Sequence, residues 1–286
     1  MRSLPRRTPG TWPEVSVIIG VKNGAGSLQR CLDSIAEQTA ASRQIIVIDS
    51  ASTDGTREIV EANARLGKIT EFVSEPDKGL YEAWNKALRR CRGAWVCFLG
   101  CDDRFHHAHA LRELLDGAAA DGQRVVYGRV NLVTESGAVV ETMGRPWAQA
   151  RRAFLAGIMI PHPGTLHHRS LFEEHGLFDE SYRIAGDYDM LLRELLVREP
   201  QFVDRVVVDM RFGGMSSKPG AIYRNLHEIQ RARAAHGLRG TPPRLRMALA
   251  AGWLGSWIQR LLGDRIYGWC ADLYRLARGK PRIWTV

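Results

Sequence analysis

Residues 44–56 read QIIVIDSASTDGT, an uninterrupted apolar run that ends in an aspartate and a turn rich in Ser, Thr and Gly. An apolar run without the polar alternation of a half-exposed strand is typical of a parallel strand buried on both faces. Similar runs occur at 15–20, 69–74 and 94–99. Asp54 is a helix-capping residue type, so we expect the strand and turn to lead directly into a helix.

Segments with apolar residues at helical spacing separate these four strands, at 27–37, 54–65 and 80–92. Because strands and helices alternate, the pattern predicts an α/β fold with a mostly parallel sheet and helices on both faces. After residue 104 the rhythm loosens. We expect further strands at 125–128 and 138–142, and further helices at 148–155 and 186–199.

The charge of the chain is unevenly distributed. Its 286 residues contain 40 Lys and Arg against 31 Asp and Glu, a formal net charge of +9. Residues 211–286 hold 14 Lys and Arg against 3 Asp and Glu, which leaves 26 against 28 in residues 1–210. With 45% hydrophobic residues, this composition excludes a disordered or fibrous chain and predicts a near-neutral globular domain with a basic extension.

Cysteine usage and the N-terminus bear on the compartment. The five cysteines are an odd number without paired spacing, which favours reduced thiols in the cytoplasm over a disulfide framework. The first residues lead into Pro and Trp rather than an apolar segment, so no signal peptide is expected. The longest uncharged apolar stretch near the C-terminus, 247–259, is shorter than the about 20 residues of a membrane-spanning helix.

Each of the four N-terminal strands is followed by polar residues, namely Asn23, Asp49, Asp77 with Lys78, and Asp102 with Asp103. The carboxyl ends of parallel strands share one edge, where open α/β sheets bind ligands. Adjacent carboxylates repel each other unless a cation lies near them, and oxygen ligands suit Mg²⁺ or Mn²⁺, ions that usually accompany phosphates. A solvated turn or helix cap is the alternative for any one of these residues.

Two other kinds of site have weaker support. Cys97 and Cys101 lie near three histidines in the sequence, but on a strand they are roughly 13 Å apart, too far to converge on one zinc ion. Gly24 and Gly26 lack the third glycine of a dinucleotide-binding loop, and no Walker A sequence occurs.

A second carboxylate pair, Asp187 and Asp189, opens an apolar helix. Helix capping explains the pair adequately. A general base distinct from the metal ligands explains it equally well, and both readings stay open on the residues alone.

Taken together, these segments resemble the inverting family 2 glycosyltransferases of the A-type nucleotide-sugar fold (GT-A). The resemblance extends over about residues 13–217. The segments that carry it, in the family's order, are 15–23, 48–56, 77–86, 98–103, 162–165, 176–180, 186–189 and 213–216.

The resemblance implies a nucleotide-sugar donor held by the N-terminal half. By correspondence with the family, Asp49 binds the nucleobase or ribose, with Val21 and Asn23 beside it. Asp77 and Lys78 flank the nucleotide.

The resemblance also implies the reacting groups. Asp102 contacts the ribose or donor sugar, Asp103 ligates Mn²⁺ or Mg²⁺, and Asp187 is the base that deprotonates an acceptor hydroxyl. A single displacement then inverts the anomeric centre. Further candidates on the acceptor or diphosphate side are His162, Asp189 and Ser216.

The sequence departs from the family pattern at three positions. Gly20 replaces a proline, Cys101 replaces the first aspartate of the DxD motif, and Gly186 replaces the glutamate that often precedes the base. These departures motivate an alternative, a non-catalytic nucleotide-sugar-binding or scaffold protein. A sugar nucleotidyltransferase would need a Gly-rich basic loop, which residues 20–26 supply poorly.

We divide the chain into an N-terminal tail (1–12), a catalytic domain (13–217) with nucleotide-sugar (13–104) and acceptor (105–217) halves, and a basic amphipathic helical tail (218–286). Within 244–280, Trp253, Trp257 and Leu261 recur at helical spacing among arginines. This stripe either packs on the catalytic domain or docks on an anionic membrane surface.

No nucleic-acid partner is expected, because the tail contains no recognition motif. The function that the resemblance implies is a metal-dependent glycosyltransferase acting on a glycan or lipid-linked acceptor. Its expected place is the cytoplasmic side, peripheral on the inner face of the cell membrane, in surface-polysaccharide, lipopolysaccharide or glycolipid synthesis.

Overall fold

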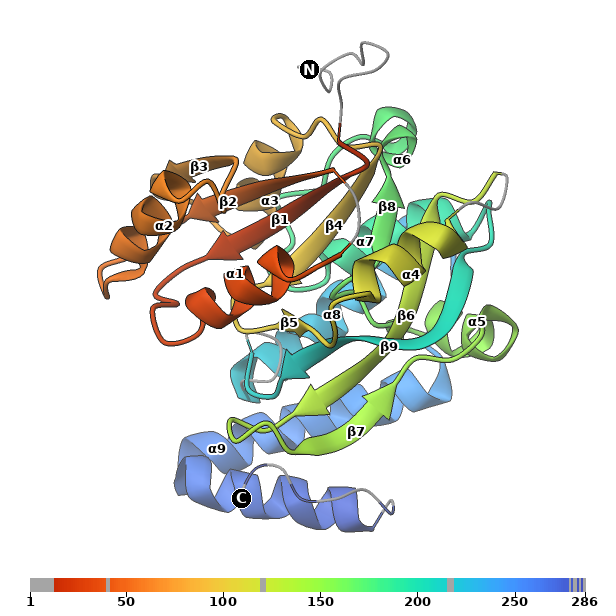
Figure 1. The fold of residues 1–286 in the computed structure, drawn as a ribbon. Helices are drawn as coiled ribbons and strands as arrows, with labels where there is room; N and C mark the ends of the chain where they lie inside the picture. Colours follow the sequence, from red (N-terminus) through yellow and green to blue (C-terminus); the bar gives the residue numbers. More distant parts are fainter. Residues whose placement is uncertain are drawn as a thin grey trace.

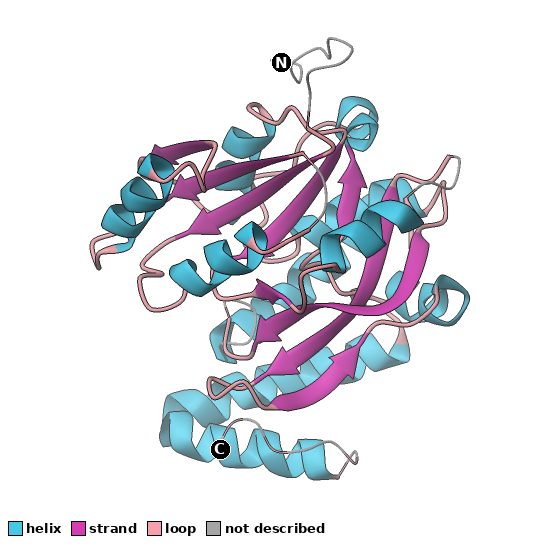
Figure 2. Cartoon of the chain, viewed as in Figure 1, coloured by secondary structure: helices cyan, strands magenta, loops and turns pink. Residues whose placement is uncertain are grey.

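The computed structural model describes residues 13–39, 42–118, 122–214 and 219–277, together with 279, 282 and 284. Within them, nine strands form one sheet that is covered by helices on both faces (Figures 1 and 2). The strands are β1 (Val15–Val21), β2 (Arg43–Asp49), β3 (Glu71–Ser74), β4 (Trp95–Gly100), β5 (Arg104–Phe105), β6 (Val125–Val133), β7 (Val139–Met143), β8 (Leu166–His168) and β9 (Gln201–Arg211). The helices are α1 (Leu28–Ala36), α2 (Thr56–Arg65), α3 (Leu80–Leu88), α4 (Ala110–Gly117), α5 (Trp147–Leu155), α6 (Arg169–His175), α7 (Gly186–Leu195), α8 (Pro219–Ala235) and α9 (Pro243–Leu276).

The N-terminal half of the sheet is parallel, as the sequence predicts. Strand β1 pairs with β2 on one side and β4 on the other, and β2 pairs with β3. Successive side chains of β1 alternate between the two faces, so that Val17 and Ile19 join one apolar core and Ile18 joins the other. Burial on both faces accounts for the uninterrupted apolar runs in the sequence.

The C-terminal half of the sheet is mixed, so the expected mostly parallel sheet describes only part of it. The full order is β3-β2-β1-β4-β8-β6-β9-β5. Strand β7 lies outside this order and pairs with β6. Strand β8 is antiparallel to both β4 and β6, whereas β6 and β9 are parallel. Only residues 134–138 connect β6 and β7. So short a connection can join two antiparallel strands, whereas parallel strands need a longer crossover.

Two apolar cores lie on opposite faces of the sheet. One core is formed with α1, α2 and α4, through residues such as Leu28, Val60 and Leu111. The other is formed with α3, α5, α6, α7 and α8, through residues such as Trp84 and Ile229. The fold is therefore a three-layer α/β arrangement, and the predicted fold class is confirmed.

Helices α8 and α9 correspond to the basic tail. Helix α8 packs beside α7, and Ile229 and Ala232 are buried in the core. Helix α9 changes direction at Gly263, whose φ of 82° is left-handed, and its second part returns so that Tyr267 lies against Gly255. Figure 1 shows α9 running beneath β7 and folding back toward the C-terminus. Over the described residues, none of the helices has both the length and the apolar character needed to cross a membrane.

Candidate active site

The loops after β1 and β2 are joined to each other through Asn23. This residue has a left-handed backbone (φ 53°); its N–H donates to Ser52 Oγ at 2.7 Å, and its Oδ1 accepts from the N–H of Thr53 at 2.9 Å. The N–H of Ser50 donates to the carbonyl of Val21 at 2.8 Å. Asn23 therefore holds the two strand-end loops side by side.

Asp49 ends β2 and is fully buried. Its Oδ1 accepts from the hydroxyl and N–H of Ser52, and its Oδ2 accepts from Ser74 Oγ at 2.6 Å. Because hydroxyl and N–H donors surround it, this carboxylate has a fixed position in the floor of the β1–β2–β3 edge.

Asp77 also lies at this edge and is held from two sides. Its Oδ1 is 2.5 Å from Lys86 Nζ in α3, and its Oδ2 accepts from Ser50 Oγ at 2.8 Å. Next to it, Lys78 is exposed, and only its backbone is fixed: its N–H donates to Glu82 at 2.7 Å, and its carbonyl accepts from Arg183. The ammonium group of Lys78 thus remains at the surface beside the loops.

Asp102 and Asp103 follow β4 in a tight turn. Asp103 is only 6% exposed, and its Oδ1 accepts from the N–H of Arg211 at 3.1 Å. Burial, and then the neighbouring negative charge of Asp102, raise the pKa of Asp103 to about 7. A buried carboxylate beside a second carboxylate is a site that a divalent cation would stabilise.

These two oxygen donors fit Mn²⁺ or Mg²⁺ better than zinc. Within the described part of the chain, no three His, Cys, Asp or Glu side chains gather into a metal-binding group, so further ligands would come from substrate or water. Burial raises the pKa of both Cys97 and Cys101 to about 12, which keeps their sulfurs protonated, whereas zinc binds thiolate.

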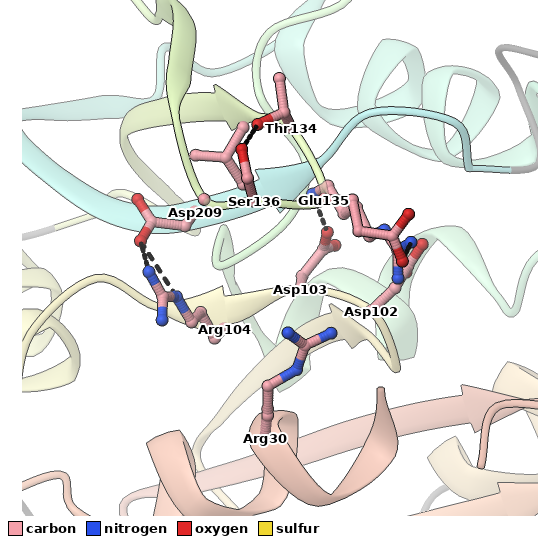
Figure 3. A pocket seen from close by; sticks show the side chains of 11 residues that line it. Arg30, Asp102, Asp103, Arg104, Thr134, Glu135, Ser136 and Asp209 are labelled. Atoms are coloured by element: carbon pink, nitrogen blue, oxygen red, sulfur yellow. Dashed lines mark hydrogen bonds and ion pairs between the residues drawn. The ribbon is translucent and has the colours of Figure 1, made fainter. Parts of the chain in front are cut away.

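Two cavities meet at the Asp102–Asp103 turn. The larger, about 300 Å³, lies between α1, β5 and the β6–β7 hairpin, with Arg30 pointing into it from α1 (Figure 3). The smaller, about 210 Å³, lies on the side of α3 and α7. Asp102, Asp103 and Arg211 line both cavities, so one polar wall serves the two spaces.

Asp187 lines the smaller cavity from the first turn of α7. Its Oδ1 accepts from the N–H of Tyr188 at 2.8 Å and from the hydroxyl of Tyr81 at 3.3 Å. Burial raises the pKa of Asp187 to about 6, although both hydrogen bonds favour the charged form. A carboxylate with a raised pKa, in the same cavity as Asp102 and Asp103, has the properties of a general base.

Two of the departures from the family pattern are explained by packing. A Cβ at residue 186 would lie 2.8 Å from the ring of Tyr81, so a glutamate there would displace the tyrosine that contacts Asp187. A Cβ at residue 20 would lie 3.1 Å from Leu80 and 3.4 Å from Trp84. Glycine at both positions permits the close approach of α3.

The family follows from comparison with known proteins. Residues 16–173, more than half of the chain, match the family model described as glycosyl transferase family 2. The chain belongs to this family. A PGL/p-HBAD biosynthesis glycosyltransferase of Mycobacterium tuberculosis is 32% identical over 219 residues, which cover 72% of this chain and 80% of the relative. Chondroitin synthase of Escherichia coli is 30% identical over 182 residues, 63% of this chain and 26% of that protein.

Solved structures show the same fold as this glycosyltransferase. TarS of S. aureus, in complex with UDP-GlcNAc, has a TM-score of 0.61 and 19% identity, covering 84% of this chain and 71% of TarS. The mannosyltransferase PcManGT of Pyrobaculum calidifontis, in complex with GDP-Man and Mn²⁺, also has a TM-score of 0.61 and 19% identity. That match covers 100% of this chain and 86% of the mannosyltransferase. The GT-A-like fold expected from the sequence is confirmed.

Of the described site residues that the sequence predicts, Asp102, Asp103 and Asp187 line the cavities, whereas the others do not, namely Val21, Asn23, Asp49, Asp77, Lys78, His162 and Asp189. His162 is buried against the rings of Trp84 and Phe98, and burial lowers its pKa to about 3. Asp189 is buried and turned toward α8, where its Oδ1 lies 2.9 Å from His236 Nε2. Ser216 lies outside the described residues.

The structure of the glycosyltransferase also brings in residues that the sequence did not single out, namely Arg30, Tyr81, Arg183 and Arg211. Tyr81 lies within a matching segment of the family, but no feature of that segment indicates that its hydroxyl reaches a residue 106 positions away. The three arginines stand among many others in a basic chain. Only the folded structure shows that these four residues line the cavities.

Proposed function

We propose that this family 2 glycosyltransferase is a metal-dependent inverting enzyme that moves a sugar from a nucleotide-sugar donor to a hydroxyl group of a glycan or lipid-linked acceptor. The observation that carries the proposal is that Asp102, Asp103 and Asp187 line one cavity at the carboxyl edge of the sheet. It favours an enzyme over the non-catalytic alternative, since a protein that only binds the donor has no need of a raised-pKa carboxylate there.

Asp187 is the proposed base. It would accept the proton of the acceptor hydroxyl as that oxygen attacks the anomeric carbon opposite the departing diphosphate, which inverts the configuration. Tyr81 keeps its proton, because burial raises its pKa well above the usual value. Its hydroxyl shares that proton between the carbonyl of Ile184, the nearer acceptor, and Asp187 Oδ1 at 3.3 Å. Asp189, the other carboxylate in the first turn of α7, is turned away from the cavity, which leaves Asp187 to act alone from this helix.

Asp103, with Asp102 beside it, would hold Mn²⁺ or Mg²⁺. When bound, the ion would neutralise the charge that develops on the diphosphate leaving group. Asp102 would also contact the ribose or the donor sugar. The N–H of Arg211 holds Asp103 in place through its Oδ1.

The nucleotide would occupy the edge formed by the loops after β1, β2 and β3. Asp49 would accept hydrogen bonds from the nucleobase or ribose, with Val21 and Asn23 beside it. Asp77 and Lys78 would flank the nucleotide. Support comes from the complexes of the two structural neighbours with UDP-GlcNAc and GDP-Man, which are nucleotide-sugar donors.

We propose further that the product belongs to a cell-surface polysaccharide or glycolipid. The support comes from two relatives, a PGL/p-HBAD biosynthesis glycosyltransferase and a chondroitin synthase. A lipid-linked acceptor would give the enzyme a reason to work at the inner face of the cell membrane.

Helix α9 is the proposed membrane contact. Its apolar side chains are unusually open to solvent: Trp253 is 53% exposed, Trp257 47%, Leu261 71% and Trp269 69%. Aromatic residues interspersed with arginines suit the surface of an anionic bilayer. We expect the full chain to float with phosphatidylglycerol vesicles and a Trp253→Ser/Trp257→Ser/Trp269→Ser variant to float less. A Leu66→Ser variant, which changes an exposed leucine on α2's C-terminal cap, is the control, and equal flotation of all three proteins would refute the contact.

The catalytic proposal is tested with Asp187→Asn, which preserves shape and removes the base. We expect turnover with Mn²⁺ and a nucleotide-sugar panel to be lost, while calorimetry gives a donor affinity within a few fold of wild type. Asp116→Asn, at an exposed carboxylate of α4, is the matched control and keeps its activity. Wild-type turnover in Asp187→Asn would refute the assignment of the base.

A further inference from the structure

A glutamate from outside the matched family segments reaches the helix that carries the base. Glu228, in α8, accepts hydrogen bonds from three consecutive backbone N–H groups in the turn that leads into α7, the last of them at its N-cap. The N–H of Arg183 lies 3.0 and 3.1 Å from its two oxygens, and those of Ile184 and Ala185 lie 2.8 and 2.9 Å from Oε2. All three donors precede Asp187 by two to four residues.

These N–H groups need an acceptor from elsewhere in the fold. The first N–H groups of a helix have no partner within it, and a Ser, Thr, Asp or Asn side chain at the N-cap usually supplies one. The N-cap of α7 is Ala185, whose methyl side chain cannot accept a hydrogen bond. The carboxylate of Glu228, from a different helix, accepts from the N–H of Ala185 and from the two N–H groups before it. Its negative charge is favourable at the positive end of the α7 dipole.

The same peptide segment is held from its other side by Tyr81. The tyrosine hydroxyl contacts the carbonyl of Ile184 and the carboxylate of Asp187. Glu228 therefore fixes the N–H groups of the segment, while Tyr81 fixes its carbonyl and the base. A shift of this turn would move the Asp187 carboxylate relative to the cavity.

Helix α8 is itself fixed on α7, so Glu228 is not a mobile surface side chain. Ile229, its neighbour, is buried in the core. The guanidinium of Arg231 lies 3.7 Å from the ring centre of Tyr182, and His236 Nε2 lies 2.9 Å from Asp189 Oδ1. These contacts anchor the chain directly after Glu228.

Glu228 also acts on the base through its charge. Burial is the main cause of the raised pKa of Asp187, and the negative charge of Glu228 raises it further. The other titratable or charged groups around Asp187 are Tyr81, which donates to it, and the residues that line the same cavity, Asp102, Asp103, Arg183 and Arg211.

We propose that Glu228 is a positioning residue for the catalytic base: a glutamate of the C-terminal helical region that binds the turn leading into α7 and sets the position and basicity of Asp187. The inference rests on the proposed role of Asp187. It makes α8 a part of the active-site structure rather than an appendage of the catalytic domain.

Two substitutions separate the two effects of Glu228. Glu228→Ala removes the acceptor, and we expect kcat to fall roughly 100-fold with the donor KM within about threefold, because a small displacement of a catalytic group has a large effect on rate. Glu228→Gln keeps an acceptor oxygen and removes the charge. We expect it to retain most of kcat at pH 8 and to move the acidic limb of the kcat profile to lower pH.

The controls are Glu58→Ala and Glu58→Gln, at an exposed glutamate of α2, which should leave kcat and the pH profile unchanged. Rates are expressed per folded molecule, so that a loss of folded protein does not imitate a catalytic effect. Should Glu228→Ala fail to fold, the pH limb of Glu228→Gln still decides the question. Wild-type kcat in Glu228→Ala, or an unmoved pH limb in Glu228→Gln, would overturn the inference.

Asp187→Asn is measured alongside. If it is inactive while the Glu228 variants match wild type, Asp187 remains the base and the role of Glu228 is refuted. If Asp187→Asn is fully active, the assignment of the base fails, and the positioning role fails with it.

Discussion

The raised pKa of Asp187 makes a quantitative prediction for the pH dependence of transfer. With a pKa of about 6, the base is about 90% ionised at pH 7 and about 10% ionised at pH 5, since one pH unit corresponds to a tenfold change in the ratio of the two forms. An aspartate at the ordinary value of 3.8 would stay almost fully ionised over this interval. We therefore expect kcat to fall about tenfold, in proportion to the ionised fraction, between pH 7 and pH 5.

The assay measures initial rates at saturating donor and saturating Mn²⁺. Asp103 also has a raised pKa, of about 7, but a bound cation holds it ionised, so its protonation should appear in the Mn²⁺ requirement rather than in kcat. Circular dichroism at each pH excludes unfolding as the cause. A kcat that stays level down to pH 5 would contradict the raised pKa, the role of Asp187, or both.

Three further substitutions test the donor side and the packing around the base. Asp103→Ala should weaken Mn²⁺-dependent donor binding at least about tenfold by calorimetry, since it removes a charged ligand, and an unchanged affinity would count against the metal site. Asp49→Ala should abolish donor binding and lower the free energy of unfolding in urea by about 1–3 kcal/mol, because it leaves the half-buried hydroxyl groups of Ser52 and Ser74 without their acceptor. Gly186→Ala should place a methyl group 2.8 Å from the Tyr81 ring, costing about 1–3 kcal/mol of stability and lowering kcat. Gly26→Ala is its control, because a Cβ there meets nothing within 4 Å. Equal stability and equal kcat of the two glycine variants would show that the Tyr81 ring can move aside without a loss of free energy.

The N-terminal strands could be predicted because their signal is local. Each of β1, β2 and β4 is buried on both faces, so its apolar run is continuous, and the ends of the predicted strands lie within two residues of the observed ones. The polar residues that follow these strands were also found, because a parallel sheet brings its carboxyl ends to one edge. By the same reasoning we expect Asp102 and Asp103 at the edge of the sheet where Asp49 ends β2.

The C-terminal half could not be predicted equally well. Strand β8 is only three residues long and pairs with β4, some 70 positions earlier, so no local pattern marks it. Strand β9 contains four charged residues, three of which, Asp204, Asp209 and Arg211, form ion pairs. Its sequence therefore lacks the continuous apolar run that identified the first strands.

The paired aspartates of α7 show what geometry adds to a motif. In the sequence, Asp187 and Asp189 are equivalent candidates at the start of one helix. In the structure, Asp187 lines the cavity and contacts Tyr81. Asp189 points away from the cavity and contacts His236, the residue that follows α8. The carboxylate of Asp187 therefore faces a cavity, and that of Asp189 is buried in contacts within the protein.

The basic tail shows what a net charge does not reveal, because a charge count describes a whole segment and not its individual residues. The excess of Lys and Arg over 211–286 suggests a separate extension, yet the one acidic residue of α8, Glu228, binds the turn that precedes the proposed base. The tail is also not uniform: α8 carries buried residues and binds the turn before α7, whereas α9 carries the exposed Trp253, Trp257 and Trp269. If α9 binds a membrane as proposed, α8 links that surface to the helix of the base through a continuous set of packed contacts. The orientation of the active site toward a lipid-linked acceptor would then follow from the fold itself.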